Sequence, residues 1–336
     1  MNYLEIIKSV LANGTPKVPT RVDNDGKVIN LDNNTTGTFC EVFRHDMSKG
    51  FPLTTLRKMP WRSIRVELEG FIKGVTDKSW YQKRGCKFWD EWANPIAVRE
   101  FYDKSYKGYS EAAKEGYIDE DLVQSFDSVK KYLQMSTNDL GPIYGYQWRN
   151  FDQHYGKRDF HESEAWVNEA NGVHTGCDQL KSIVDKLHNS PYDRRMVCSA
   201  WNPNQMDMMA LPPCHWGFNV VVYGNKLNLV WHQRSADLLL GVGANIASYA
   251  LLLLLLAEEA GLEPGELVGT LADCHIYDNL LDNARELVKR EENALPTVKI
   301  KRKSDGSFSI FDWTYEDVEL IGYDPHPAIA MGNVTV

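Results

Sequence analysis

The pattern of hydrophobic and polar positions along the chain predicts several helices. Residues 1–13 place apolar side chains at helical spacing and are followed by Gly14, which predicts an amphipathic helix with a glycine stop. Residues 62–74 and 177–188 show the same spacing. Residues 245–260 are apolar on nearly every face, so we expect a helix that is buried in the core.

Other segments have the alternation that is typical of strands. Residues 218–231 alternate on both sides of Gly224 and Asn225, which predicts a hairpin. Residues 267–277 and 297–303 are also predicted to be strands. Because strands and helices interleave without βαβ regularity, the predicted fold class is α+β.

The composition predicts a folded chain without a membrane span. The 336 residues are 43% hydrophobic and 11% aromatic, which is enough to bury a core. We expect a single catalytic domain over residues 1–336, with surface insertions at the charged, weakly periodic stretches 94–137 and 151–176. The longest apolar stretch, residues 250–257, is far shorter than the roughly 20 residues that a membrane span needs. With no secretory signal either, the sequence predicts a cytoplasmic protein with reduced thiols.

The charge balance limits the class of partner. The chain has 37 basic and 46 acidic residues, for a formal net charge of −9. This argues against nucleic acid as the main partner, but a small anion needs only a local cluster of arginines. The six cysteines show no C-x-x-C spacing, so neither a zinc module nor any other metal site is predicted.

The first candidate for chemistry is Cys214, which directly follows Pro212 and Pro213 and precedes His215. The two prolines fix two φ angles and lack backbone donors, so the thiol after them is held stiffly. Such a thiol could be a nucleophile, a metal ligand or a buried small residue, and burial is the commonest of the three.

Three further polar clusters bear on that choice. Residues 233–237 (Gln-Arg-Ser-Ala-Asp) interrupt an apolar region, and a guanidinium near a thiol favours the reactive thiolate. Arg194 and Arg195 precede a predicted strand at 196–201; adjacent arginines are usually solvated, and they clamp a phosphate only if both reach one pocket. Residues 273–277 alternate so that Asp273, His275 and Tyr277 share one side of a strand, and each of the three can bond a hydroxyl.

These clusters belong to a longer series of motifs that resembles the thymidylate synthase family nearly end to end. The matching stretches are residues 61–64 with Glu67, 89–93, 141–145 with 147–149, 193–195, 199–202, 211–215, 233–237, 245–249, Asp273 with His275 and Tyr277, and 323–327. Several long motifs in one order are far more specific than a single short one. The resemblance implies a large twisted mixed sheet flanked by helices, with the sheets packing across a homodimer interface.

The resemblance also implies an activity, which is folate-dependent one-carbon transfer to C5 of a pyrimidine nucleotide. The cosubstrate would be 5,10-methylenetetrahydrofolate. Pyrimidine C5 is a poor nucleophile until a thiolate adds at C6 and turns the ring into an enolate. The catalytic residues that the match implies are Cys214, Glu67, Asn245, Asp237, Tyr144 and His215.

Binding residues are implied in the same way. The substrate contacts would be Arg194, Arg195, Arg234, Ser235, Gln233, His275, Tyr277 and Arg21, with Arg194 and Arg195 donated across the dimer interface. The folate contacts would be Trp89, Phe88, Asp237, Leu211, Gly241, Ala244 and Val334.

Asn245 predicts which base is read. Uracil shows an acceptor at O4 and a donor at N3, and a carboxamide answers both. Cytosine shows a donor at N4 and no proton at N3, so Asn245 matches it badly. The predicted substrate is therefore dUMP.

Several positions depart from the pattern of the family's synthases. Gly243 and Ala244 stand where synthases have Pro-Phe, Gly70 replaces a tryptophan, Leu280 a histidine, and the tail 332–336 differs. The phosphate loop is degraded over residues 33–38, so Arg21 is expected to supply its arginine.

The departures bear on the product. A methylene group at C5 becomes methyl if hydride quenches it and hydroxymethyl if water does, so a synthase must exclude water. Lost bulk on the folate side predicts 5-hydroxymethyl-dUMP, made by a deoxyuridylate hydroxymethylase of the kind that phages use for modified DNA. The alternatives are a thymidylate synthase making dTMP and, more remotely, a non-catalytic nucleotide-binding protein.

Overall fold

The computed structural model describes residues 1–22, 28–30, 34–105, 133–153, 155 and 176–329. Most of both predicted insertions lies outside these ranges, as does the tail that contains Val334. The chain forms two compact units. The first contains Met1–Ile64, Ser182–Cys198 and Cys214–Val336, and the second contains Arg65–Lys181 and Ser199–Pro213.

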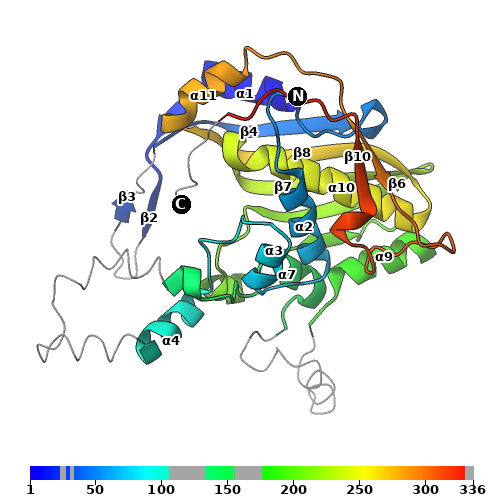
Figure 1. The fold of residues 1–336 in the computed structure, drawn as a ribbon, viewed down its shortest axis with the longest axis horizontal. Helices are drawn as coiled ribbons and strands as arrows, with labels where there is room; N and C mark the ends of the chain where they lie inside the picture. The colour runs from blue at the N-terminus through cyan, green and yellow to red at the C-terminus, as the bar shows by residue number, and fades with distance from the viewer. Residues whose placement is uncertain (23–27, 31–33, 106–132, 154, 156–175, 330–336) are drawn as a thin grey trace, which may run out of the picture. The chain divides into compact units, whose positions relative to one another are not determined.

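The first unit is built on a six-stranded mixed sheet (Figure 1). Its strands in spatial order are β1 (Thr15–Lys17), β4 (Thr35–Asp46), β8 (Glu263–Tyr277), β7 (Lys226–Asp237), β6 (His215–Tyr223) and β5 (Val197–Ser199). Neighbours β4 and β8 are antiparallel, as are β6 and β7, whereas β7 and β8 are parallel. The predicted α+β class with a large mixed sheet is confirmed.

The predicted hairpin is formed by β6 and β7. Gly224 at its turn has φ of 60° and open space beside it, so the backbone conformation, not crowding, requires the glycine. Strand β7 then pairs in parallel with β8, and α10 (Gly243–Ala260) connects the two.

Helix α10 is the buried core helix that the sequence predicts. It packs against β7 and β8, and Tyr249 stacks on Trp231 of β7 with ring centroids 5.3 Å apart. Gly261 ends the helix in the left-handed conformation, with φ of 65°. Among the described helices, the stretch Leu238–Ala260 is long and apolar enough to cross a membrane, but 72% of its most apolar window is buried in the fold. That burial is the property of a core helix.

The helix predicted at the N-terminus is α1 (Tyr3–Asn13). A capping box starts it, because Asn2 and Glu5 each accept a backbone N–H from the other. Its apolar face packs against β4 and α11 (Leu281–Leu287). The short elements of this unit are β2 (Thr20–Val22), β3 (Val28–Asn30), η1 (Met47–Lys49), η4 (Leu238–Val242) and η5 (Asp278–Leu280).

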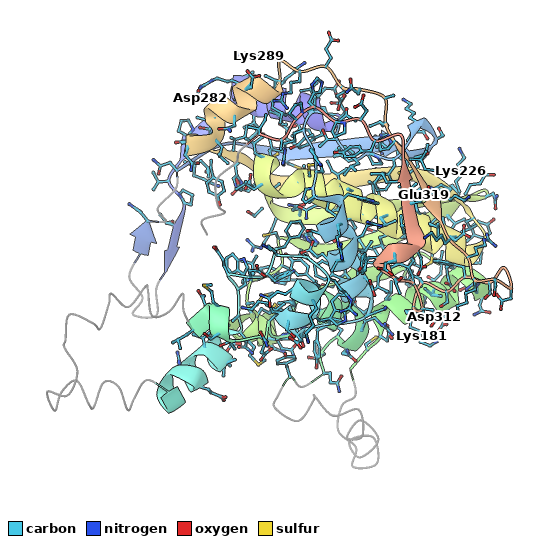
Figure 2. All side chains as sticks on the ribbon, viewed as in Figure 1. Lys181, Lys226, Asp282, Lys289, Asp312 and Glu319 are labelled. Atoms are coloured by element: carbon cyan, nitrogen blue, oxygen red, sulfur yellow. The ribbon has the colours of Figure 1, made fainter. Side chains whose placement is uncertain are left out.

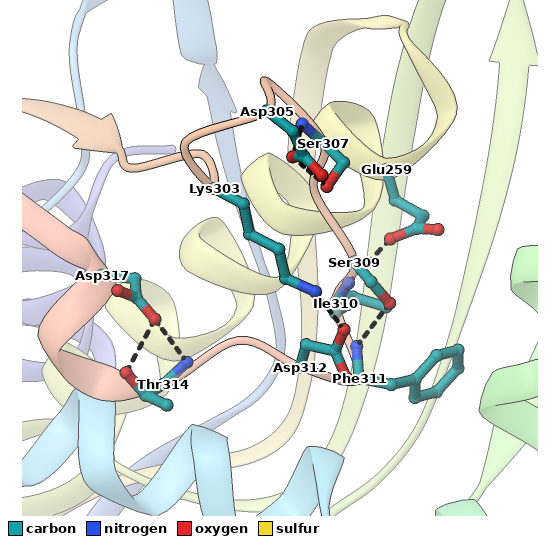
Figure 3. Close-up of polar contacts among 10 residues, drawn as sticks. All are labelled: Glu259, Lys303, Asp305, Ser307, Ser309, Ile310, Phe311, Asp312, Thr314 and Asp317. Carbon is teal, nitrogen blue, oxygen red and sulfur yellow. Dashed lines mark hydrogen bonds and ion pairs between the residues drawn. The ribbon is translucent and has the colours of Figure 1, made fainter.

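The strand predicted at 297–303 is shorter, because β9 (Thr297–Ile300) ends where its partner β10 (Val318–Ile321) begins. Polar contacts hold the loop between them (Figure 3). Ile310 donates its backbone N–H to Glu259 at the end of α10, at 2.7 Å. Lys303 pairs with Asp312 at 2.6 Å, and a capping box starts η6 (Tyr315–Asp317).

Figure 2 labels six charged side chains, all of them exposed.

The second unit holds the helices α3 (Lys78–Lys83), α4 (Pro95–Ser105), α7 (Tyr144–Asn150) and η3 (Pro203–Met208). Two predicted helices, α2 (Trp61–Ile72) and α9 (Gln179–Asn189), extend across its boundaries in sequence. Its core is aromatic. Phe71 stacks on Tyr144 with centroids 4.9 Å apart and meets Trp148 and Trp89 edge-on.

Candidate active site

The sheet of the first unit brings three of the polar clusters together at one end. Parallel pairing of β7 with β8 sets Ser235 opposite Asp273 and Asp237 opposite His275. Strand β6 runs the other way, so it begins at this end, where His215 pairs with Gln233. Cys214, residues 233–237 and residues 273–277 therefore meet, although they lie far apart in the sequence.

Cys214 lies directly beside a guanidinium. Arg234 places Nη2 at 3.9 Å from the Cys214 Sγ, and its backbone N–H donates to the Cys214 carbonyl at 2.8 Å. Both residues are half-buried. A cation at this distance stabilises the thiolate over the thiol, and the thiolate is the form that attacks an electrophilic carbon.

The carboxamide of Asn245 is oriented by Gln233. The indole N–H of Trp231 donates to Gln233 Oε1 at 3.2 Å, and because an indole N–H can only donate, this contact determines which end of the Gln233 amide is oxygen. Gln233 Nε2 then donates to Asn245 Oδ1 at 3.2 Å and to the Ser235 carbonyl at 2.9 Å. Asn245 Oδ1 is thereby identified as the acceptor end, and Nδ2 is the donor end.

The predicted hydroxyl-binding residues of β8 also lie together. The rings of His275 and Tyr277 are 5.5 Å apart, and His275 Nδ1 lies 3.6 Å from Asp273 Oδ1. His275, whose Nδ1 is also 3.2 Å from the Asp273 backbone carbonyl, lowers the pKa of Asp273 to about 2 together with Lys17. Burial raises the pKa of Tyr277 to about 12, so its hydroxyl keeps its proton as a donor.

Asp237 caps the short helix η4 that leads into α10. Its Oδ1 accepts the backbone N–H groups of Leu239 and Leu240 at 3.0 and 3.1 Å. Burial raises the pKa of this carboxyl, and the two backbone hydrogen bonds oppose that rise. Gly241, a predicted folate contact, lies beside the Asn245 amide, since a Cβ there would be 3.5 Å from Asn245 Oδ1.

His215, a predicted catalytic residue, lies in the core against Tyr249. It is buried, its Nδ1 lies 2.9 Å from the Tyr249 hydroxyl, and burial lowers its pKa to about 3. The imidazole is therefore neutral at physiological pH.

The second unit holds a separate cluster around Glu67. The Trp89 indole N–H donates to Glu67 Oε1 at 3.0 Å, and Tyr144 lies 5.9 Å from the Trp89 ring. Burial raises the pKa of Glu67 to about 7, although the hydrogen bond from Trp89 opposes the rise. Of the predicted folate contacts, Trp89 is buried, whereas Leu211 is half-buried and Phe88 is 36% exposed.

Of the predicted phosphate-binding arginines, Arg234 lies beside Cys214, whereas Arg194 and Arg195 lie outside these clusters. Arg194 and Arg195 are exposed on the turn before β5, the edge strand of the sheet. Asp193 accepts the backbone N–H of Arg195 at 2.8 Å and so shapes that turn. Arg21 belongs to β2, and its side chain lies outside the described part of the structure. Within the described ranges, no three His, Cys, Asp or Glu side chains are grouped as metal ligands would be.

Comparison with known proteins decides the family. A family model described as thymidylate synthase matches residues 1–335. The chain is 36% identical over 334 residues to a thymidylate synthase of Mycoplasma pneumoniae, which covers 99% of each chain. The chain belongs to the thymidylate synthase family. A thymidylate synthase of Staphylococcus haemolyticus is 39% identical over 315 residues, which is 89% of this chain and 91% of the relative.

Membership confirms the predicted enzyme class and cosubstrate. Thymidylate synthase family proteins are one-carbon transferases that use methylenetetrahydrofolate. The names of both relatives favour a methyl product over the hydroxymethyl product that the sequence departures suggest.

The structure corrects the premise of the hydroxymethyl interpretation at Gly70. A Cβ at Gly70 would lie 2.3 to 2.5 Å from two ring carbons and the hydroxyl oxygen of Tyr81, so the tyrosine occupies the space beside the glycine. Tyr81 is fully buried, and its hydroxyl donates to the Val75 carbonyl at 3.0 Å. The expected loss of bulk at Gly70 is therefore wrong, because an aromatic ring from the next helix refills the volume.

Gly243 is also in contact with its surroundings. A Cβ there would lie 3.2 Å from Met59 Cε and 3.6 Å from the Tyr3 hydroxyl. The sequence gives no sign that Tyr81 and Met59 fill these spaces, because each comes from a different segment of the chain than the glycine beside it.

Proposed function

We propose that this protein transfers a methyl group to C5 of dUMP and yields dTMP and dihydrofolate. The observation that carries the proposal is the Cys214–Arg234 pair, at 3.9 Å, in a chain whose full length matches thymidylate synthases. The exposed positions of Arg194 and Arg195 suit donation to a partner's site, so we infer a homodimer. We also infer a cytoplasmic location, where the nucleotide and the reduced folate are available.

The nucleotide is activated by covalent addition. Cys214 Sγ, as thiolate, forms a bond to C6 of the uracil ring; the π pair of C5=C6 becomes the C4=C5 bond, and the π pair of C4=O4 moves onto O4 to give the enolate. Arg234 stabilises the thiolate before addition. It also binds the phosphate of dUMP, and Ser235 is a second donor to that phosphate.

Asn245 stabilises the charge that develops on the base. Its Nδ2 donates to O4, where the enolate forms, and Oδ1 accepts from N3–H while it also accepts from Gln233. His275 and Tyr277 bind the 3′-hydroxyl of the deoxyribose, and the protonated Tyr277 is the donor.

Protons at the base are moved by Glu67. With a pKa of about 7 the carboxyl is present in both protonation states at neutral pH, so it can give a proton to O4 and later take it back. When bound, methylenetetrahydrofolate supplies the one-carbon unit and the hydride that completes the methyl group. Asp237 can accept a hydrogen bond from a folate ring N–H through Oδ2, because its other oxygen, Oδ1, accepts from the backbone N–H groups of Leu239 and Leu240.

The product is tested by incubating the protein with dUMP and methylenetetrahydrofolate. We expect the absorbance rise of dihydrofolate in step with loss of C5 hydrogen, and a methylated nucleotide by mass spectrometry. Hydride must come from the folate ring for a methyl product, whereas a water quench leaves tetrahydrofolate. Turnover without the absorbance rise, together with a hydroxymethyl product, would return the protein to the hydroxymethylases.

The base specificity is tested by Asn245→Asp. The carboxylate accepts from N4 of cytosine and, when protonated, donates to its N3, so dCMP should gain relative to dUMP. A buried mismatched hydrogen bond costs about 1–3 kcal/mol, which corresponds to roughly 5- to 150-fold in relative kcat/KM. Asn225→Asp, at the exposed tip of the hairpin, is the control and should keep the preference for dUMP. An unchanged preference in Asn245→Asp would place base reading elsewhere.

A further inference from the structure

Lys78, the first residue of α3, carries a fully buried ammonium group. Its Nζ lies 3.2 Å from the carbonyl oxygen of Asp90, 3.0 Å from that of Trp92 and 2.6 Å from that of Gln134. An ammonium has three N–H donors, and here all three are directed to backbone carbonyls. A buried cation persists only where its donors are matched in this way.

The three carbonyls belong to two segments. Asp90 and Trp92 lie in the turn over residues 87–92, in which Asp90 donates to the Lys87 carbonyl at 3.2 Å and Trp92 to the Trp89 carbonyl at 3.1 Å. Gln134 belongs to the helical residues 133–136, which lie near the end of the first predicted insertion, residues 94–137. Lys78 therefore ties the turn that carries Trp89 to the end of that insertion.

The backbone beside Lys78 is also tied to the insertion's end. The Lys78 backbone N–H donates to the Asn138 carbonyl at 2.7 Å, and the Leu140 N–H donates to the Thr76 carbonyl at 2.9 Å. These bonds hold the start of α3 along residues 138–140. The start of α3 is therefore fixed by backbone bonds, and the Lys78 ammonium reaches from it to the turn.

The residue at the centre of the turn is Trp89, whose indole N–H donates to Glu67 at 3.0 Å. We propose that Lys78 is a positioning residue for Glu67: its ammonium holds the turn over residues 87–92 so that the Trp89 indole stays on the Glu67 carboxyl. This inference rests on the proposed function only in so far as Glu67 transfers protons.

Charged and titratable groups lie near both Lys78 and Glu67. Asp90 is the acidic side chain that acts on Lys78, and its Oδ1 already accepts from Gln82 Nε2 at 3.0 Å. Burial lowers the pKa of Lys78, and Asp90 opposes that shift. On the other side of Trp89, the titratable groups beside Glu67 are Tyr81, with Glu69 and Cys86 next to it.

The test uses Lys78→Met, which has a similar shape and no donors, and Lys78→Gln, which keeps an amide N–H pair. Lys83→Met is the matched control, because Lys83 ends the same helix and is exposed. The Trp89 indole ¹⁵N–¹H signal of the full chain, identified by its loss in Trp89→Phe, is followed as a function of pH without substrate. In wild type we expect it to titrate with Glu67 near pH 7.

Lys78→Met should uncouple the indole from Glu67. We expect its signal to lose the titration and the midpoint of Glu67 in the pH–rate profile to move upward, because the lost donor stabilised the carboxylate. We expect kcat to fall about 100-fold with KM for dUMP little changed, since a misplaced group costs rate rather than binding. Lys78→Gln should lie between wild type and Lys78→Met, and Lys83→Met should match wild type.

The double variant Lys78→Met/Trp89→Phe decides whether the lysine acts through the tryptophan. It should be no slower than the slower single variant. An unchanged indole titration in Lys78→Met and Lys78→Gln, or fully additive losses in the double variant, would overturn the proposal. A wild-type protein that shows the indole titration but turns over no dUMP would overturn the proposed function and leave the positioning role supported.

Discussion

Replacement of Cys214 by alanine should reduce release of tritium from C5 of labelled dUMP by about 10⁴-fold or more, the scale of loss when a covalent nucleophile is removed. C5 exchanges its hydrogen only after C6 has been attacked, so the step that the variant lacks precedes every later one. Binding of dUMP should persist, because Arg234, Asn245 and Tyr277 remain. The measurements are tritium release and equilibrium binding on the same preparation.

The other cysteines are the controls for this experiment. Cys40 and Cys177 are exposed, and Cys86, Cys198 and Cys274 are buried. Burial, reinforced by Glu41 and Asp273, raises the pKa of the Cys274 thiol, so this second cysteine near the site stays protonated and inert. Single replacements of these five should keep activity. An active Cys214→Ala variant, with activity lost instead on replacing Cys198 or Cys274, would refute the assignment.

Glu67→Gln should lower kcat by about 10²- to 10⁴-fold and remove the pH dependence near neutrality. The amide has nearly the shape of the carboxylic acid and can still meet the Trp89 indole, but it cannot exchange protons. The pH–rate profile of the wild type should bend near pH 7, the pKa of Glu67, and the profile of the variant should lack that bend.

Thermal stability gives a second measure of the same group. The pKa of Glu67 in the folded protein lies above its ordinary value of 4.5, so the bound proton stabilises the fold fully below about pH 4.5. That contribution is lost as pH rises through about 7. Glu67→Gln, which mimics the protonated form, should therefore melt higher than wild type at pH 8, with the difference shrinking toward pH 5.

Glu69→Gln is the matched control for both measurements. Glu69 lies two positions further along α2 and pairs with Lys73 at 2.6 Å. Its loss should lower stability, because the lysine loses its partner, yet the bend near pH 7 should remain. A Glu69→Gln variant that loses the bend while Glu67→Gln keeps it would move the proton-transfer role from one carboxylate to the other.

Local pattern was enough to predict the main elements of this fold. The apolar run at 245–260 could only be buried, and it is α10; the alternation around Gly224 is the β6–β7 hairpin. These features depend on neighbours within one helix or one hairpin. The same holds for the polar clusters, whose motifs were sufficient to assign the family that the full-length comparisons confirm.

Contacts between distant segments were beyond the reach of that pattern. Gly70 predicted an empty volume because the sequence shows which side chain is missing but not which one moves in, and Tyr81 of the next helix fills it. The motif that contains His215 could not show its protonation state, whereas its burial against Tyr249 lowers its pKa to about 3 and keeps it neutral.

The sequence by itself determined the α+β class and the buried helix, because both follow from residue type and local spacing, and its motifs determined the family by resemblance. Only the tertiary structure decided the state of the polar groups. It determines which end of the Asn245 amide is the acceptor, how far burial raises the pKa of Glu67, and which carbonyl oxygens accept from Lys78. Each of these depends on solvent exclusion and on partners from other segments. Burial and hydrogen-bond partners are properties of the packed chain, and no stretch of sequence contains them.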